Sequence, residues 1–316
     1  MMLMDEKAHF VVGIDIGTSM VRSVVGSVER GGKVSVVGYG EASSSGMRRG
    51  AVANLAGPAE AIDMSLKPAQ DMSGTEVGQA TLGVNGAHVM STKANGMIVV
   101  GVADHEIDGE DLARVEGVAS VGKIPENREI LGVVAYEYKL DGQGGIKNPL
   151  GMKGTRLEVE ANVLSNLKPL CDNLRRAAEM AEVKVEQLVP TAVAAARAVL
   201  TEQQMENGVA VVDMGAKTTG VAIYDGGDLQ YVGVVPIGSQ DITNDLAMIL
   251  GIVPETAEKI KLRFASGRFG VTEKDVVLKE GREELRFARE EVDSVVEARL
   301  EEIFDGVQKE LKKAGY

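Results

Sequence analysis

Two stretches of the chain repeat one order of apolar and polar positions. Residues 11–28 read VVGIDIGTSMVRSVVGSV, and residues 209–226 read VAVVDMGAKTTGVAIYDG. Each begins with an apolar run that ends in an Asp, continues through a Gly and small polar residues, and returns to a second apolar run. Short runs rich in β-branched residues are typical of strands, and polar segments with Gly are typical of tight turns. Both stretches therefore predict a strand, a tight turn and a second strand, with a third strand after the next polar turn.

The repeat indicates two related halves of the molecule. Asp15 of the first copy and Asp213 of the second are 198 residues apart. This spacing is too wide for a solenoid, because solenoid repeats are about 20 to 50 residues long. Two duplicated α/β domains that face each other across a cleft explain the spacing more simply.

The segments around the two copies predict further elements. Apolar residues at helical spacing predict helices, and alternating or continuous apolar runs predict strands. From residue 85 to 165 the pattern changes to strands around one helix, which indicates a small inserted α/β subdomain. The expected elements are a broken helical segment at 54–74, the inserted helix at 108–122, strands at 129–140 and 155–165, helices at 167–183, 189–204, 241–252 and 254–265, a strand and turn at 267–281, and one long helix at 283–313.

Composition limits the class of protein. A chain of 316 residues with 44% hydrophobic residues is long and apolar enough for two domains with cores. The formal net charge is −13, from 34 basic and 47 acidic residues. Such an acidic surface repels the phosphates of nucleic acid, so nucleic acid is not expected as a partner. Aromatic residues make up only 3% and Trp is absent, so stacking platforms for single-stranded nucleic acid are not expected either.

The cysteine and the lengths of the apolar runs bear on location. Cys171 shares a helical stripe with Leu170, Leu174 and Ala178, which predicts a buried thiol without a disulfide partner. No apolar run approaches the roughly 20 residues that span a bilayer, and the first ten residues lack the pattern of a signal peptide. We therefore expect a soluble protein of the cytoplasm.

The residue types in the two turns suggest phosphate binding. Glycines let the backbone approach a phosphate, so that N–H groups donate to its oxygens, and Thr or Ser hydroxyls add further donors. A carboxylate there would repel a phosphate unless a divalent cation lies between them, and Mg²⁺ is commonly held by carboxylates and phosphate oxygens together. One such turn alone is an ordinary turn. Two copies in matching strands favour a pair of turns that holds Mg²⁺ and a polyphosphate.

Three segments resemble the actin-like ATPase superfamily of actin, heat-shock chaperone ATPases and sugar kinases. GIDIGTS at 13–19 resembles its first phosphate loop, VVDMGAKTTGVAIY at 211–224 resembles its second, and AEKIK at 257–261 resembles its helix on the adenosine side.

More specific segments resemble one branch, the bacterial cell-division protein FtsA family. These segments are SSSGMRRGAVANL at 43–55, GIKNPLGMKGTRLEVEANVL at 145–164 and EARLEEIF at 297–304. The segment at 145–164 discriminates best, because actin and the chaperones have no counterpart there. The resemblance covers almost the whole chain.

The resemblance implies an actin-like α/β fold, with two duplicated α/β domains around a nucleotide cleft and an inserted small subdomain. Relatives continue past the long helix into a strand and later a C-terminal amphipathic helix that binds membrane, so we expect a C-terminally shortened form. The implied division is 1–84 with 166–205 for the first actin-like domain, 85–165 for the inserted subdomain, 206–239 with 283–316 for the second actin-like domain, and 240–282 for its small subdomain.

The resemblance also implies binding of ATP with Mg²⁺ at named positions. Asp15 and Asp213 would hold the cation through water. Gly238 would approach the nucleotide, while Glu258 and Lys261 would meet the ribose and the base; without the resemblance, these two residues are an ordinary i, i+3 ion pair. The implied phosphate ligands are Asp15, Gly17, Thr18 and Ser19 on the first turn and Asp213, Gly215, Ala216, Lys217, Thr218 and Thr219 on the second.

Partners are implied by the resemblance as well. The family polymerises into actin-like protofilaments and recruits the tubulin-like division protein FtsZ to the cytoplasmic face of the membrane. Arg299 and Glu302 match the positions that receive the C-terminal tail of FtsZ, although an exposed i, i+3 ion pair is the plain alternative. Other division proteins are expected to bind through 85–165, and the membrane through the C-terminal helix beyond Tyr316.

The chain departs from the family at a few positions. The family usually has Lys at the position of Met20, and Gly, Gly and Asp at the positions of Ala216, Lys217 and Gly220. The ammonium of Lys217 could replace the missing charge near the phosphates. No residue is identified as a general base, so hydrolysis stays open. The alternatives are an actin-like scaffold of type IV pilus assembly, favoured by the altered second turn, and a small-molecule kinase, for which no catalytic Asp stands out.

Overall fold

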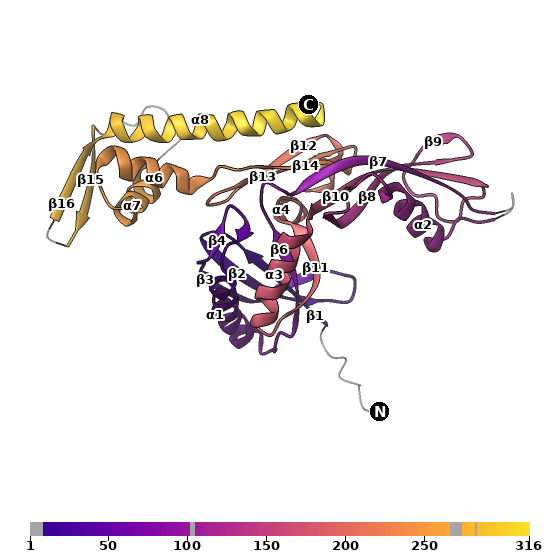
Figure 1. Cartoon of the computed structure of the whole chain (residues 1–316), viewed down its shortest axis with the longest axis horizontal. Helices are drawn as coiled ribbons and strands as arrows, with labels where there is room; N and C mark the ends of the chain where they lie inside the picture. Colours follow the sequence, from indigo (N-terminus) through magenta and orange to yellow (C-terminus); the bar gives the residue numbers. More distant parts are fainter. Residues whose placement is uncertain (1–8, 102–104, 266–273, 282) are drawn as a thin grey trace. The chain divides into compact units, whose positions relative to one another are not determined.

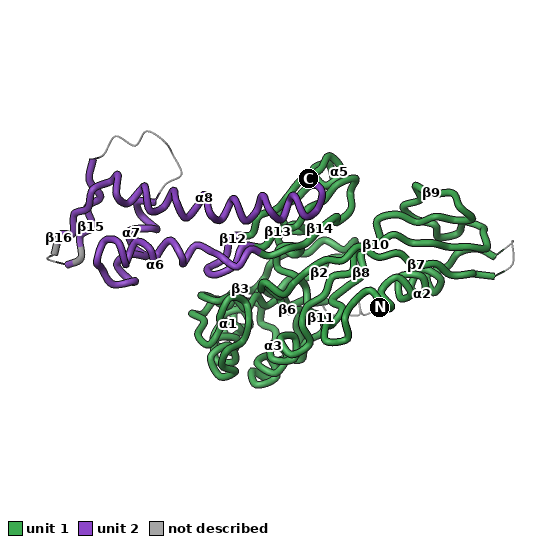
Figure 2. The backbone as a smooth tube through the Cα atoms, turned by 45° about the horizontal axis from the view of Figure 1, so that its top comes forward, with its two compact units in different colours: residues 1–213, 220–234 green, residues 214–219, 235–316 purple. Residues whose placement is uncertain are grey.

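The computed structural model describes residues 9–101, 105–265, 274–281 and 283–316. The chain forms two compact units, which Figure 2 shows in different colours. Unit 1 contains residues 1–213 and 220–234, and unit 2 contains residues 214–219 and 235–316. The chain therefore passes between the units on both sides of the second Asp turn and again at the end of the following hairpin.

The first sheet of unit 1 contains the first copy of the repeat. Its strand order is β11-β6-β1-β2-β3, where β1, β2 and β3 pair antiparallel and β6 lies parallel between β1 and β11. The prediction of strand, turn and two further strands is confirmed here. The bounds are β1 His9–Ile16, β2 Met20–Val28, β3 Val34–Ser43, β6 Gln79–Val84 and β11 Lys184–Pro190.

Helices and a small two-stranded sheet accompany this sheet. The segment expected as a broken helix is one helix, α1, with Pro68 inside it. The helix expected at 189–204 is two short helices, α4 and α5, because Thr201 and Gln204 form a capping box that starts a new helix. The bounds are β4 Met47–Arg48, β5 Ala51–Val52, α1 Ala56–Ser73, α3 Lys168–Met180, α4 Thr191–Val199 and α5 Glu202–Glu206.

The core of this part of unit 1 confirms the buried cysteine. Cys171 is fully buried on α3 among Leu174, Ala178 and the apolar residues of the sheet. Burial raises the pKa of its thiol to about 12, with a smaller contribution from the nearby Glu129 carboxylate. Cys171 is therefore a packing residue and is protonated at neutral pH.

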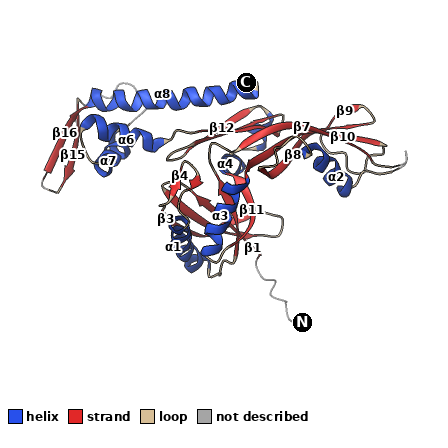
Figure 3. Cartoon of the chain, viewed as in Figure 1, coloured by secondary structure: helices blue, strands red, loops and turns tan. Residues whose placement is uncertain are grey.

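The inserted subdomain of unit 1 is an antiparallel sheet with one helix. Its strand order is β7-β10-β8-β9, and α2 covers one face. The loop expected after β8 contains a further short strand, β9. Figure 3 shows these elements by secondary structure. The bounds are β7 Met90–Val99, α2 Gly109–Ser120, β8 Arg128–Leu140, β9 Gln143–Ile146 and β10 Arg156–Leu167.

The second copy of the repeat forms a three-stranded sheet in the order β12-β13-β14. Its three strands were all expected from the sequence. β13 and β14 form a hairpin, and most of that hairpin belongs to unit 1 together with the inserted subdomain. The bounds are β12 Val209–Met214, β13 Thr219–Asp225 and β14 Asp228–Val235.

Unit 2 packs three helices and a two-stranded sheet around one apolar core. The long helix expected from residue 283 begins at Arg289, because Glu283–Ala288 is a strand, β16, that pairs antiparallel with β15. The expected strand at 267–281 is β15 from Asp275 onward, and its part at 267–273 lies outside the described residues. The bounds are α6 Ser239–Leu250, α7 Pro254–Phe264, β15 Asp275–Glu280, β16 Glu283–Ala288 and α8 Arg289–Ala314.

Two further expectations from the sequence concern the division into domains and the helices that could span a membrane. The four-part domain division stays a prediction, and its boundary between residues 282 and 283 lies within the β15–β16 sheet. Of the helices in the described ranges, none has both the length and the apolar content needed to cross a membrane.

Candidate functional site

The first Asp turn connects the ends of β1 and β2. Asp15 lies opposite Arg22 on β2 and pairs in parallel register with Gly83 on β6. The turn closes through a hydrogen bond from Gly17 N to Met20 O of 3.0 Å. Two residues after β3 support it: the Gly50 N–H donates to Thr18 Oγ1 at 3.4 Å, and the Ser44 N–H donates to Ser19 O at 2.8 Å.

Asp213 lies close enough to Asp15 to raise the pKa of the Asp15 carboxyl. Burial raises the pKa of Asp15 most, the Asp213 carboxylate raises it further, and Arg22 opposes both. Among the described residues, neither carboxylate takes part in a hydrogen bond or ion pair. Two carboxylates that repel each other and lack donors form a suitable pair of ligands for a hard divalent cation. The residues present therefore fit Mg²⁺.

The N-terminus of α4 lies beside this acidic pair. A Cβ on Gly83 would be 2.9 Å from Thr191 Cγ2 and 3.2 Å from Asp15 Oδ1. A Cβ on Gly220 would be 3.0 Å from the Cβ of Ala192 and 3.8 Å from that of Asp213. No side chain caps α4, so the backbone N–H groups of its first turn are not used by a cap. The sequence indicated a helix here but not its position beside the two Asp residues.

Two further polar atoms near the first turn were not expected. Ser44 Oγ and Asn85 Oδ1 are buried and have no hydrogen-bond partner. Buried polar atoms are nearly always paired in folded proteins, so an unpaired atom beside this turn is available to a ligand or a bound water. Asn85 directly follows β6, and no motif in the sequence identified it.

The second Asp turn lies on the start of α6 in unit 2. Its backbone closes from Gly215 N to Thr218 O at 2.9 Å, and Ser239 N donates to Gly215 O at 2.9 Å. Gly238 comes so close that a Cβ there would be 2.6 Å from Gly215 O and from the carbonyl of Ala216. Only glycine fits at 238, which explains the residue that the sequence analysis selected.

Lys217 is already paired within unit 2. Its ammonium lies 2.9 Å from Asp241 Oδ1, and the other oxygen of Asp241 accepts from the Gly238 N–H at 3.0 Å. Both side chains are mostly buried, with 23% and 22% of their surface exposed. A phosphate that bound Lys217 would therefore compete with Asp241 for the ammonium.

Glu258 and Lys261 on α7 reach across to α6. Lys261 Nζ is 2.7 Å from Glu258 Oε2, and it also donates to Thr243 Oγ1 at 2.9 Å and to Ser239 O at 3.2 Å. Burial raises the pKa of Glu258, but hydrogen bonds from Lys261 and Thr243 lower it more, so the carboxyl stays ionised. The pair is therefore more than an exposed i, i+3 contact, because Lys261 is fixed at the first turn of α6.

The candidate partner residues form an ion triad on α6 and α8. Arg299 Nε and Nη2 lie 2.8 and 2.6 Å from Asp245 Oδ2, and Arg299 Nη1 lies 2.5 Å from Glu302 Oε2. The exposed fraction is 24% for Arg299, 22% for Asp245 and 53% for Glu302. The Asp245 carboxylate raises the pKa of Arg299 most. The sequence analysis missed Asp245, since nothing in the pattern links residues 54 positions apart.

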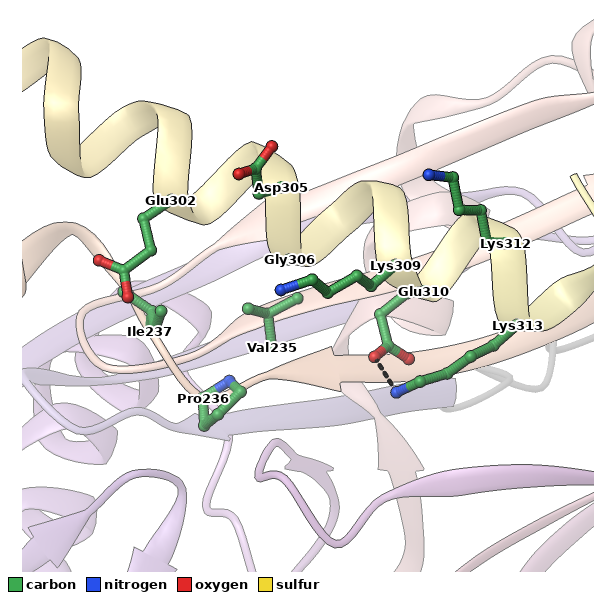
Figure 4. A pocket seen from close by; sticks show the side chains of 10 residues that line it. All are labelled: Val235, Pro236, Ile237, Glu302, Asp305, Gly306, Lys309, Glu310, Lys312 and Lys313. Carbon is green, nitrogen blue, oxygen red and sulfur yellow. Dashed lines mark hydrogen bonds and ion pairs between the residues drawn. The ribbon is translucent and has the colours of Figure 1, made fainter.

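A groove of about 660 Å³ lies beside this triad, between the C-terminal half of α8 and the end of β14. Figure 4 shows the apolar residues Val235, Pro236 and Ile237 along one side and lysines and acids of α8 along the other. α8 can approach this closely because Gly306 faces Val235: a Cβ there would be 2.5 Å from Val235 Cγ1.

Family comparisons match two parts of the chain. Residues 86–165 match the family described as "SHS2 domain inserted in FTSA", and residues 210–313 match "Cell division protein FtsA". Whole-chain relatives have the same description. The chain is 34% identical to the FtsA of Pseudomonas aeruginosa over 98% of the chain and 75% of that protein. It is 32% identical to the protein of Neisseria meningitidis over 99% and 76%, and 31% identical to that of Escherichia coli K12 over 95% and 72%.

Solved structures agree on the fold. A PilM–PilN type IV pilus biogenesis complex has a TM-score of 0.57 at 16% identity and covers 80% of this chain and 69% of that chain. MreB5 of Spiroplasma citri, bound to AMPPNP, has a TM-score of 0.51 at 14% identity and covers 96% and 79%. These likenesses concern the fold alone. Together with the family matches and the whole-chain relatives, they show that this chain has an actin-like fold and belongs to the FtsA family of cell-division proteins.

Proposed function

We propose that this cell-division protein binds ATP with Mg²⁺, assembles into actin-like protofilaments and recruits FtsZ to the cytoplasmic face of the membrane. One observation supports nucleotide binding most: Asp15 and Asp213, from the two copies of the repeat, converge, and among the described residues neither carboxylate has a hydrogen bond or an ion pair, although the charge of Arg22 acts on Asp15. They would hold the Mg²⁺, which would screen the phosphates from the two carboxylates.

The other candidate residues would bind the nucleotide itself. The backbone N–H groups of the two turns and the hydroxyls of Thr18, Ser19 and Thr218 would donate to phosphate oxygens. The hydroxyl of Thr219 donates to Ile237 O at 2.8 Å, so it would bind a phosphate only after leaving that carbonyl. Lys217 would contribute a cation after leaving Asp241. Gly238, with Glu258 and Lys261 beside the first turn of α6, would meet the nucleoside. The chain offers no general base that we identify, so the proposal concerns binding rather than turnover.

Thermal unfolding with and without Mg²⁺-ATP tests this proposal. A ligand that binds only the folded state stabilises it by about 2.7 kcal/mol at a hundred times its Kd, so we expect the Tm of the wild type to rise by several degrees. Asp213→Asn should lose most of that rise. Asp63→Asn, at an exposed position on α1, is the matched control and should respond like the wild type. Equal responses of wild type and Asp213→Asn would mean that the second turn is only structural.

The FtsZ tail is proposed to bind at the Arg299 triad. Glu302 is half exposed, and Arg299 is held by Asp245 with its third nitrogen paired with Glu302, so an incoming peptide would compete with Glu302 for that nitrogen. Fluorescence anisotropy with a labelled FtsZ tail peptide from the same organism tests this. We expect Arg299→Ala to weaken binding at least tenfold, because loss of a partly buried charge costs more than loss of a rim charge. Arg286→Ala, at an exposed ion pair on β16, is the control. Unchanged binding by a folded Arg299→Ala variant would place the tail elsewhere.

The alternative functions have weaker support. The PilM–PilN pilus complex shares the fold at 16% identity. However, the inserted subdomain and the second copy of the repeat both match FtsA family models. A small-molecule kinase would need a further catalytic Asp beside the acidic pair, and no such Asp stands out in the sequence. The interaction of other division proteins with 85–165 stays part of the proposal.

A further inference from the structure

Lys147 connects the inserted subdomain to the β13–β14 hairpin. It lies directly after β9, which Figure 1 labels, in the segment that resembles the FtsA family. Its side chain reaches the turn between β13 and β14. Its ammonium donates to Gly226 O at 3.0 Å and to Tyr136 O of its own subdomain at 3.3 Å, and it forms an ion pair with Asp228. One side chain therefore ties the turn of the hairpin to the inserted sheet.

Two further side chains of the inserted subdomain hold β14 along its length. Asn162 on β10 donates from Nδ2 to Leu229 O at 2.6 Å. Ser91 on β7 accepts from the Val232 N–H at 2.9 Å, and its hydroxyl lies 3.2 Å from Val232 O. Ser91 thus bonds both backbone groups of one residue, as a neighbouring strand would. The hairpin is held at three successive places by polar contacts from the subdomain.

Asn162 indicates that this attachment is more than close packing. The residue is 1% exposed, and its Oδ1 is buried without a hydrogen-bond partner. A buried unpaired polar atom is costly, and an apolar residue of similar size would avoid that cost. The amide is explained by its bond to the backbone of β14, which an apolar side chain could not make.

The opposite end of the hairpin lies against the acidic pair. β13 begins at Thr219, directly after the second Asp turn, and its next residue, Gly220, packs against Ala192 of α4 and the Cβ of Asp213. A Cβ at Gly220 would lie 3.0 Å from the Cβ of Ala192, which is a tight contact, so a displacement of the hairpin toward it moves Asp213 or α4. The inserted subdomain therefore holds one end of an element whose other end borders Asp213.

We propose that Lys147, Asn162 and Ser91 are positioning residues that couple the inserted subdomain to the cation and nucleotide site at Asp15 and Asp213. This inference rests on the proposed binding of Mg²⁺-ATP. Through the hairpin, the nucleotide alters the inserted subdomain, and a partner bound to that subdomain alters nucleotide affinity. Thermodynamic linkage requires the two effects to be equal in size.

Hydrogen exchange of the full chain, measured with and without Mg²⁺-ATP beside a direct binding titration, tests the coupling. In the wild type we expect the nucleotide to slow exchange in the hairpin at 220–234 and also in the inserted subdomain at 86–165. Lys147→Met should bind the nucleotide roughly fivefold more weakly, and the slowing should no longer reach the subdomain. Lys147→Arg, which keeps the charge and the donors, should restore both effects.

Controls separate this coupling from a loss of folding. Lys147 is 61% exposed, so its replacement should leave the fold intact. Lys153→Met, an exposed lysine of the same segment, should behave like the wild type. Ser91→Ala removes the contact with Val232 on β14 independently of Lys147, and it should reproduce the effect of Lys147→Met on exchange.

The outcomes distinguish the coupling from the proposed function. If the wild type binds Mg²⁺-ATP but exchange in 86–165 does not change, or changes as much in Lys147→Met and Ser91→Ala as in the wild type, the coupling is wrong while the proposed function stands. If the titration detects no binding of Mg²⁺-ATP to the wild type, both are wrong. A purely structural attachment would lower stability in the variants without altering the nucleotide-dependent part of the exchange.

Discussion

The ion pair between Arg299 and Asp245 should contribute measurably to the stability of unit 2. The relevant perturbation is a double-mutant cycle of Arg299→Ala and Asp245→Ala, with Arg299→Ala and Glu302→Ala as the matched cycle. In both pairs the same guanidinium is removed. The two cycles differ in the burial of the carboxylate partner, because Asp245 is 22% exposed and Glu302 is 53% exposed.

The size of each coupling follows from that exposure. Exposed ion pairs contribute about 0.2 to 1 kcal/mol, whereas hydrogen bonds to charged groups shielded from water contribute about 1.5 to 3 kcal/mol. Arg299 makes two contacts of 2.8 and 2.6 Å to Asp245, and both side chains are about three-quarters buried. We therefore expect a coupling of about 1 to 1.5 kcal/mol for Arg299 with Asp245 and of about 0.3 kcal/mol for Arg299 with Glu302.

Native-state hydrogen exchange is the suitable measurement, because the two units can unfold separately and a single unfolding curve would mix them. A coupling of 1.4 kcal/mol corresponds to roughly tenfold in the protection of the α6 and α8 amides. Equal couplings for Asp245 and Glu302, or a coupling below about 0.5 kcal/mol for Asp245, would refute the assignment of Arg299 as a residue anchored on α6. The measurement also shows how much of any effect on peptide binding is due to loss of local order.

Three further outcomes follow from the site. Because burial and Asp213 raise the pKa of Asp15, the contribution of Asp15 to stability is largest below the unfolded pKa of about 3.9 and is lost as pH rises through the folded pKa. Asp15→Asn should therefore raise the Tm of the ligand-free protein at pH 7, and raise it less at pH 4, while it abolishes the response to Mg²⁺-ATP. A lower Tm of Asp15→Asn at pH 7 would contradict this. Gly238→Ala should cost about 1 to 3 kcal/mol in urea unfolding, because its Cβ would meet the backbone of 215–216, whereas Gly132→Ala has no atom within 4 Å of its Cβ and should not show that clash. Cys171, with a pKa of about 12, should resist iodoacetamide at pH 8 until urea unfolds the chain, so rapid labelling of folded protein would contradict its burial.

The strands and turns of the repeat could be predicted from the sequence because strand formation and tight turns depend on neighbouring residues. Continuous β-branched runs, each followed by an Asp and a Gly, predicted β1 and β12 correctly. Because both Asp residues lie at the ends of these strands, the fold places Asp15 and Asp213 close together. Two wrong predictions, the single helix at 189–204 and the start of the long helix at residue 283, also concern local patterns. Thr201 with Gln204 is a capping-box spacing, and Leu285 with Phe287 alternates as in a strand before the helical stripe of α8 begins at Val292.

Other features could not be predicted because they depend on contacts between distant segments. The pairing of Arg299 with Asp245, the position of α4 beside the acidic pair and the attachment of β14 to Lys147 all join residues far apart in sequence. Strand β11 is polar along much of its length and is a strand only because β6 lies beside it. Propensity is a weak guide where tertiary pairing decides the conformation.

The candidate residues of the two units differ in how their charges are balanced. In unit 2, Lys217 is neutralised by Asp241 and Lys261 by Glu258, so both cations must leave an existing partner to bind a phosphate. Breaking such partly buried ion pairs costs about 1 kcal/mol or more each, which reduces the affinity that these lysines can add.

In unit 1 the candidate residues are two like-charged carboxylates rather than cations that are already paired. Asp15 and Asp213 repel each other without a ligand, and a bound cation relieves that repulsion. The dependence of stability on Mg²⁺ should therefore come mainly from the acidic pair, and the dependence on phosphate from the turns. Mg²⁺ alone should stabilise the wild type slightly and Asp15→Asn not at all, because only the cation compensates two adjacent carboxylates.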